Sequence, residues 1–324
     1  MNQVEIGDAF EVLADTFCIA TEYPEVADAP LWIYLLRDPG SGSCALSDCG
    51  VPSTYERVLT KALPAIGVEL SQIDWILLTH GHPDHMGGHP GLRGRTSFKV
   101  AAPLEDVIWV ESVDRQWHDF WDAFPGALSL EAEKDGLVAM CGGDLPVDLI
   151  LRDGDTFELG DRKLEVVLTR GHTRGHCAFF ERETGLLLSG DMTQGYGLSS
   201  SSGTSVFAPL YDDADDYVRG LERLRELPFT KLCPAHLLPM DRDEGLELIE
   251  RSIAFTDEMD SLVATLLAGA DRPLTTVEVA TAIGEFCGMS PRVAAHTVYT
   301  ASAHLKRAAR RGLAVPQWAA AGSA

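Results

Sequence analysis

The sequence feature that most constrains this chain is the segment THGHPDH at residues 79–85. It directly follows the apolar run 75–78, which has the length of a short buried strand. The alternative interpretation is a polar surface turn, but three histidines and one aspartate within six residues are dense for such a turn. Imidazole nitrogens and carboxylate oxygens are ligands that zinc and related transition metals accept. The segment therefore predicts a metal site that uses His80, His82, Asp84 and His85.

Further candidate ligands follow other short apolar runs. His172 and His176 come after 164–168, Asp191 comes after 186–188, and His236 comes after Leu232. One histidine after a strand would be weak evidence. Loops at the same edge of a sheet converge on one site, however, and one contiguous segment does not easily saturate two ions. The sequence therefore predicts that ligands from several strand ends meet at one centre.

The order of patterns along the chain predicts an α/β fold. Apolar runs alternate with helical patterns up to about residue 240. The composition, 45% hydrophobic and 23% charged, is ordinary for a globular protein. No apolar run approaches the roughly 20 residues that cross a bilayer. The seven cysteines are scattered without a CxxC pair and the N-terminus lacks the pattern of a secretory signal, so we expect a cytoplasmic protein with reduced thiols.

The motifs together resemble those of the metallo-β-lactamase-fold hydrolase superfamily. The shared pattern is HxHxDH, GHTxGH, a GD aspartate and a late histidine, spread over residues 15–240. The resemblance implies an αββα sandwich with two metal ions at one edge. It implies that one ion is held by His80, His82 and His172, the other by Asp84, His85 and His236, and that Asp191 bridges them. His176 matches a position that is usually structural in the family, so it is not counted as a ligand.

The complete ligand set resembles the glyoxalase II, lactonase and thioesterase branches. It implies that a hydroxide shared by two metal ions attacks a small ester, thioester or lactone, with Asp191 and Asp84 as catalytic residues. We expect Zn²⁺, with iron or manganese as alternatives because the same ligands serve all three. Tyr196, in a loop after Asp191, is a candidate for holding the substrate carbonyl; the alternative is an ordinary loop aromatic residue.

Residues 104–150 form a long stretch with aromatic residues at helical spacing. They are interpreted either as a lid inserted over a substrate pocket, in which Trp117 and Trp121 contact the substrate, or as helices that pack on the core.

We expect a catalytic domain at 1–242 and a small helical, winged-helix-like domain at 243–324. Five basic residues and no acidic residue follow residue 286, namely Arg292, Lys306, Arg307, Arg310 and Arg311. This basic tail either binds nucleic acid, as in an RNA-cleaving enzyme of the same fold, or packs against an acidic surface of its own core or of a sister subunit. The net charge of −23 weighs against nucleic acid. The sequence is also compatible with a homodimer.

Overall fold

The computed structural model describes residues 4–21, 30–124, 126–128, 130–199, 205–291 and 293–313. A seven-stranded sheet comes first, in the order β1-β2-β3-β4-β5-β6-β7. Its first four strands pair antiparallel and β4 to β7 pair parallel. The strands are β1 (Ala9–Leu13), β2 (Thr16–Thr21), β3 (Leu31–Arg37), β4 (Cys44–Ser47), β5 (Ile73–Leu77), β6 (Lys99–Pro103) and β7 (Leu149–Leu151).

A second, six-stranded sheet has the order β15-β14-β11-β10-β9-β8. Its strands are β8 (Thr156–Leu159), β9 (Arg162–Leu168), β10 (Cys177–Glu181), β11 (Leu186–Gly190), β14 (Lys231–Pro234) and β15 (Met240–Asp241). A separate two-stranded ribbon consists of β12 (Leu198–Ser199) and β13 (Ser205–Phe207). The apolar runs predicted as strands at 75–78, 164–168, 186–188 and around Leu232 thus lie within or next to β5, β9, β11 and β14.

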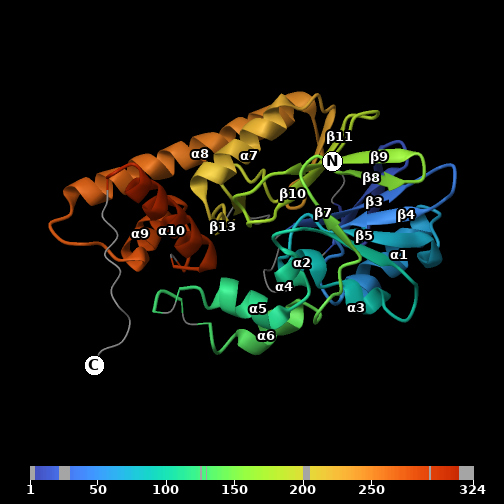
Figure 1. Ribbon diagram of the computed structural model, residues 1–324, viewed down its shortest axis with the longest axis horizontal. Helices are drawn as coiled ribbons and strands as arrows, with labels where there is room; N and C mark the ends of the chain where they lie inside the picture. Colours follow the sequence, from blue (N-terminus) through green and yellow to red (C-terminus); the bar gives the residue numbers. More distant parts are fainter. Residues whose placement is uncertain are drawn as a thin grey trace.

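The two sheets pack face to face, and helices cover both outer faces (Figure 1). The centre contains side chains of both sheets, such as Leu36 and Leu77 from the first and Phe179 and Cys233 from the second. Strand β3 is buried along nearly its whole length because both of its faces are covered. This four-layer arrangement confirms the predicted αββα sandwich.

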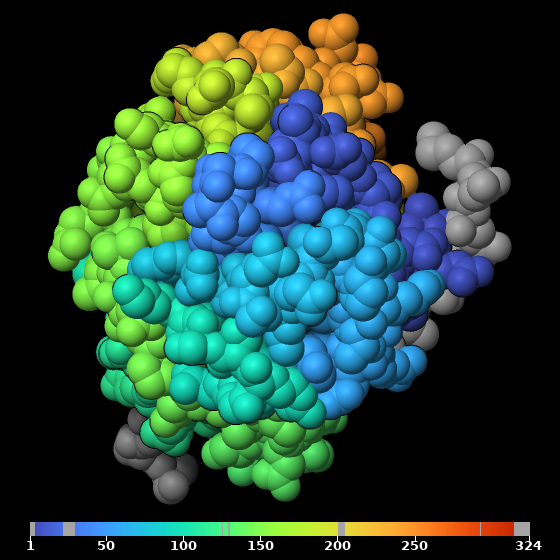
Figure 2. Space-filling view, turned by 90° about the vertical axis from the view of Figure 1, so that its right-hand side faces the viewer, coloured from blue at the N-terminus to red at the C-terminus, as the bar shows by residue number. Residues whose placement is uncertain are grey.

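Short helices cover the outer face of the first sheet or connect its strands. They are η1 (Tyr55–Leu59), α1 (Thr60–Ala65), η2 (Leu70–Gln72), α2 (Pro83–Met86) and α3 (His89–Leu92). Residues 104–150 hold α4 (Val107–Val110), α5 (Val113–Gln116), η3 (Trp117–Trp121) and α6 (Lys134–Met140). Figure 2 faces the right-hand end of Figure 1, where the blue and cyan residues of the first sheet and its helices form most of the surface.

Helices α7 (Ala214–Glu226) and α8 (Arg242–Gly269) cover the second sheet. Helices α9 (Thr276–Phe286) and α10 (Ala295–Arg310) pack against each other and against α8. The start of α9 is capped by Thr275, whose Oγ1 accepts the Glu278 N–H, while the Glu278 carboxylate accepts the Thr275 N–H. Val279 and Val298 share one apolar cluster with Leu221 of α7 and Phe180 of the sheet. Among the described residues after 241 the regular elements are helices, and the winged-helix likeness and the boundary at 242 stay predictions.

In the described part of the chain, none of the helices combines the length and the apolar character that crossing a membrane requires. The described cysteines are all free thiols, as the sequence predicted.

Candidate metal centre

The loop that carries HxHxDH is held from below by Asp48, which follows β4. The Asp48 carboxylate accepts the Thr79 N–H at 2.8 Å and the Thr79 hydroxyl at 3.0 Å. Pro83 then starts helix α2, where its missing N–H costs no hydrogen bond. The turn before α2 presents His80 and His82, and the helix presents Asp84 and His85. All four side chains are buried.

The first ligand group consists of His80, His82 and His172. Nε2 of His80 and Nε2 of His172 each lie 3.0 Å from Nδ1 of His82. The Nδ1 of His172 is 2.7 Å from the Leu210 carbonyl oxygen, so it carries the proton and its Nε2 has a free lone pair. The Nδ1 of His80 faces the Thr79 hydroxyl at 3.0 Å, and that hydroxyl already donates to Asp48. Three nitrogen lone pairs therefore face one another.

The second ligand group consists of Asp84, His85 and His236. Oδ2 of Asp84 lies 3.5 Å from Nε2 of His85 and 3.4 Å from Nε2 of His236. The other ring nitrogens are fixed, because His85 Nδ1 donates to Asp48 Oδ2 at 2.9 Å and His236 Nδ1 donates to the Pro30 carbonyl at 2.8 Å. Such outer contacts orient the imidazoles of metal-binding histidines.

Asp191 lies between the two groups. Its Oδ2 is 3.5 Å from Nε2 of His172 and 3.3 Å from Nε2 of His236, and its Oδ1 is 3.4 Å from Nε2 of His85. Its backbone N–H donates to Nε2 of His176 at 3.1 Å. His176 thus supports the loop of Asp191 and does not belong to a ligand group, in line with its predicted structural role.

The residues present fit metal ions. Three groups, His80–His82–His172, His80–His85–Asp191 and Asp84–His85–His236, each place their ligand atoms within 4.8 Å of one another. Nε2 of His85 and Oδ1 of Asp191 are buried without a hydrogen-bond partner. A buried polar atom without a partner is unfavourable, and a shared cation would satisfy both atoms at once. The nitrogen and oxygen donors are those of a zinc-like ion.

The electrostatics of the cluster also favour a cation. Burial lowers the pKa of His80, His82 and His172, which keeps them neutral as ligands. Burial acts the same way on His85 and His236, but the carboxylates of Asp84 and Asp191 outweigh it. The pKa of His236 rises to about 10, and the pKa of His85 rises well above its usual range. Without a metal ion, protons on these two rings balance the two carboxylates.

Asp106 is a supporting residue that the sequence reasoning missed. One carboxylate oxygen accepts the Gly81 N–H at 3.0 Å and the Thr173 hydroxyl at 2.6 Å, and the other accepts the Gly175 N–H at 2.8 Å. Asp106 therefore ties the HxHxDH loop to the GHTxGH loop. Burial raises its pKa to about 6 despite these three donors. A usable signal existed, because Asp106 follows the apolar strand β6 in the same way that the ligands follow theirs.

We expect Asp106→Asn to weaken metal binding by roughly 10- to 100-fold, because an amide cannot accept all three hydrogen bonds and the two loops lose their common anchor. Competition with a chelator of known affinity measures this effect. Asp114→Asn, at an exposed position of the same stretch, is the matched control. Equal metal affinity in the wild type and Asp106→Asn would contradict the role assigned to Asp106.

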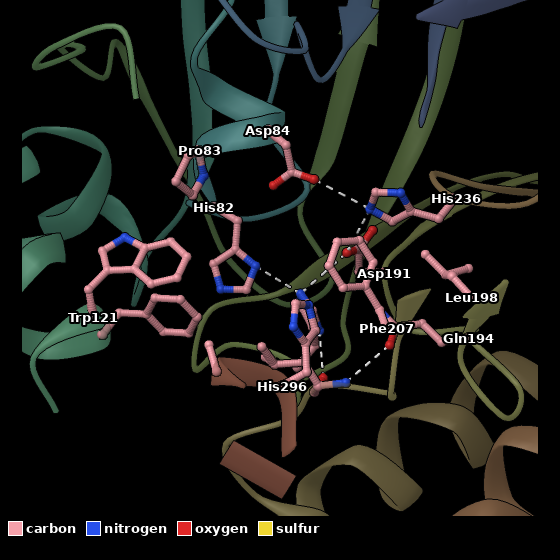
Figure 3. A pocket seen from close by; sticks show the side chains of 14 residues that line it. His82, Pro83, Asp84, Trp121, Asp191, Gln194, Leu198, Phe207, His236 and His296 are labelled. Carbon is pink, nitrogen blue, oxygen red and sulfur yellow. Dashed lines mark hydrogen bonds and ion pairs between the residues drawn. The ribbon is translucent and has the colours of Figure 1, made fainter. Parts of the chain in front are cut away.

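A pocket of about 520 Å³, its open part included, lies directly over the cluster (Figure 3). Its lining contains members of both ligand groups together with apolar side chains from four parts of the chain. The lining residues are His82, Pro83, Asp84, Phe120, Trp121, His172, Asp191, Gln194, Leu198, Phe207, Leu210, His236, Ala295 and His296. The sequence predicted the ligands and Trp121, and Phe120 belongs to the aromatic stretch interpreted as a possible lid, whereas Phe207 and His296 were not singled out.

Two predicted substrate-side residues do not line this pocket. The Tyr196 hydroxyl donates to Glu258 of α8 and the ring lies against Phe255, so the side chain points away from the cluster. Trp117 is buried with the Lys134 ammonium 4.7 Å from its ring centre, so its face is already covered. The structure therefore corrects the expectation that Tyr196 and Trp117 contact the substrate, and it retains Trp121.

The described basic residues of the tail are paired within the chain. Lys306 contacts Asp212, Arg310 contacts Asp213 and Asp215, and Arg307 and Arg311 contact Asp260. Arg292 lies outside the described residues. The acidic partners lie at the start of α7 and on α8. This pairing supports the interpretation that the tail neutralises an acidic surface of its own core.

Known proteins resemble this chain in sequence. The family model of the metallo-beta-lactamase superfamily matches residues 29–236. A hydroxyacylglutathione hydrolase from Methylococcus capsulatus is 31% identical over 207 residues, 63% of this chain and 61% of that protein. The chain therefore spans less than two thirds of the length of that relative. A protein of the same name from Rhodobacter capsulatus is 28% identical over 252 residues, 77% of this chain and 78% of that protein.

Solved structures agree in fold over nearly the whole chain. A metallo-beta-lactamase family protein from Thermus thermophilus has a TM-score of 0.70 at 24% identity and covers 93% of this chain and 95% of that one. A beta-lactamase domain protein from Burkholderia ambifaria has a TM-score of 0.70 at 24% identity, over 96% of this chain and 92% of that one. With the family model matching more than half of the sequence, the chain belongs to the metallo-beta-lactamase superfamily.

Proposed function

We propose that this chain is a metal-dependent hydrolase that uses two divalent metal ions to cleave a small ester, thioester or lactone. The observation that carries the proposal is the position of Asp191, whose carboxylate lies beside histidines of both ligand groups at the floor of a pocket. The relatives named hydroxyacylglutathione hydrolase support a carbonyl substrate of this kind.

His80, His82 and His172 would hold one ion, Asp84, His85 and His236 the other, and Asp191 both. When bound, such a pair of ions activates water and polarises a carbonyl oxygen. The carbonyls of Leu210 and Pro30 keep His172 and His236 in the tautomer that leaves Nε2 free. Asp84 lines the pocket, so the carboxylate oxygen that does not face His85 and His236 would be placed to accept a proton from the attacking water and return it to the leaving group. Phe120 and Trp121 keep bulk water from this wall of the pocket.

The pocket favours a carbonyl substrate over a phosphodiester. Among the described lining residues there is no Lys or Arg to bind phosphate oxygens. The tail that suggested nucleic-acid binding has its described charges paired internally. RNA cleavage therefore stays the weaker alternative. The free thiols support the predicted reducing, cytoplasmic compartment, and zinc stays the metal that we propose.

The experiment that tests this function measures acid release by the metal-loaded protein from a matched panel of thioesters, lactones and simple esters. We expect release from one of these classes and its loss in the chelated protein. No release from any class by a protein with two metal ions per chain would contradict the proposal. A bis-aryl phosphodiester in the same panel shows whether the weaker alternative applies.

Trp121 gives a more local prediction. Its side chain lines the pocket, so the ring is available for contact with a bound acyl group. We expect Trp121→Ala to raise KM by roughly tenfold with little change in kcat, because the lost contact is made in ground and transition state alike. Trp117→Phe is the control from the same helix and should leave KM unchanged. An unchanged KM in Trp121→Ala would assign the ring to packing.

A further inference from the structure

His296 is a pocket residue that no ligand motif includes. It belongs to the first turn of α10 and lines the pocket together with Asp191 and His236. Figure 3 shows it on the side of the pocket across from Pro83 and Asp84. The start of α10 therefore contributes part of the wall of the pocket.

The ring of His296 is held in place but is not used by the protein. It stacks on Phe207, with ring centres 4.2 Å apart and an interplanar angle of 25°. None of the described residues forms a hydrogen bond with its ring nitrogens, and it belongs to none of the three ligand groups. His172 and His236, by contrast, each have Nδ1 bound to a backbone carbonyl. A fixed imidazole with unused nitrogens at a pocket wall is suited to bind a polar atom of a ligand.

The surroundings of His296 define what that ligand atom belongs to. The wall beside it is apolar and consists of Phe120, Trp121, Leu198, Phe207, Leu210 and Ala295. The side-chain oxygen of Gln194 already accepts the Leu210 N–H at 3.1 Å. Burial lowers the pKa of His296 to about 4, so the ring is neutral at pH 7 and offers one donor and one acceptor. An apolar wall with one neutral imidazole matches an uncharged acyl group that carries one hydroxyl or keto oxygen.

We propose that His296 hydrogen-bonds a hydroxyl or keto oxygen on an otherwise apolar, uncharged acyl group of the substrate, and so selects oxygenated aryl or branched acyl esters and thioesters. This inference rests on the proposed function and adds the substrate class. Phe207 supports it by fixing the plane of the imidazole. None of the three ligand groups includes His296, so its substitution should not change metal binding.

The test uses two thioesters of N-acetylcysteamine that differ by one hydroxyl, the mandelyl and the phenylacetyl thioester, with the metal-loaded full chain. We expect the wild type to favour the mandelyl thioester by roughly tenfold in kcat/KM, which is the effect of one hydrogen bond of about 1.4 kcal/mol. His296→Phe keeps a ring stacked on Phe207 and removes the nitrogens, so the preference should collapse to about one. His296→Asn should restore part of it.

His118→Phe is the matched control, because it makes the same change at an exposed position outside the pocket. Metal content per chain should be the same in all four proteins. A structural role for His296 predicts something different, because His296→Phe would then slow both thioesters equally and leave their ratio unchanged. That result would overturn the inference.

A binding measurement separates this inference from the proposed function. Mandelate and phenylacetate are titrated into each protein while tryptophan fluorescence is followed. Tighter binding of mandelate by the wild type and equal binding of both acids by His296→Phe support the role of His296, even if no thioester is cleaved. Equal binding of both acids by the wild type would refute it, even if the panel shows hydrolysis.

Discussion

Asp191→Ala should lower kcat/KM for the cleaved substrate by roughly three orders of magnitude, because about 4 kcal/mol of transition-state stabilisation depends on two ions held together. Asp191 is the carboxylate that lies beside His172 of one group and both His85 and His236 of the other. Without its carboxylate, the two ligand groups have no ligand in common. Steady-state kinetics, together with metal content per chain, measure the effect.

The same variant should remain folded. The backbone N–H of Asp191 keeps its hydrogen bond to His176, and the change removes no backbone contact. In the metal-free protein the variant loses the carboxylate that faces His85 and His236. We therefore expect the metal-free variant to unfold cooperatively, at a somewhat lower temperature than the metal-free wild type. Asp271→Ala, at an exposed loop position, is the control for the substitution itself, and turnover that survives in Asp191→Ala would refute the proposed site.

Removal of the metal ions is expected to have the second large effect. At a free metal concentration a thousand times above Kd, binding to the folded state contributes roughly 4 kcal/mol to the free energy of unfolding. Treatment with a chelator should therefore lower Tm markedly and abolish turnover, and zinc should restore both. Calorimetry of the chelated and reloaded chain checks this, and an unchanged Tm after verified metal loss would contradict the proposed centre.

The difference in Tm between the zinc-loaded and the chelated protein should also increase as the pH rises. In the metal-free protein the pKa of His236 is raised to about 10 by Asp191 and Asp84. A raised pKa contributes stability that is complete below about pH 6.5 and is lost as the pH rises through about 10. The stability contributed by metal binding increases as the pH rises, because the ion must displace protons from His85 and His236. Melting curves at pH 6 and pH 8 should show that zinc raises Tm more at pH 8 than at pH 6. A smaller increase in Tm at pH 8 would contradict this linkage.

The ligand set was predictable because its geometry is largely local. Four of the candidate ligands lie within six residues, where one turn and one short helix fix their relative positions. The others follow β9, β11 and β14 of the second sheet, and the packing of the two sheets brings their loops to the HxHxDH loop, which follows β5 of the first sheet. Apolar runs and motif residues in the printed sequence, through the family that they resemble, therefore predicted both the sandwich and the candidate metal centre.

Some residues that are close in sequence have side chains that point to different parts of the structure. Tyr196 lies five residues after Asp191, but Gly195 and Gly197 flank it with φ of 58° and 96°. These left-handed positions direct the tyrosine toward Glu258 of α8. Trp117 and Trp121 share one helical turn, yet Trp121 alone reaches the pocket. No local pattern encodes these directions, because they depend on which surface packs against each side chain.

The sequence by itself predicted several of the strands, the candidate ligands and the family, since each depends on patterns along a few residues. The tertiary structure alone decided which distant side chains complete the site. Asp106 joins two loops that are about ninety residues apart in sequence, and the basic tail finds its aspartates on α7 and α8. His296 reaches the pocket because α10 packs against Phe120 through Tyr299. Such contacts arise from the packing of whole layers, which sequence spacing does not record.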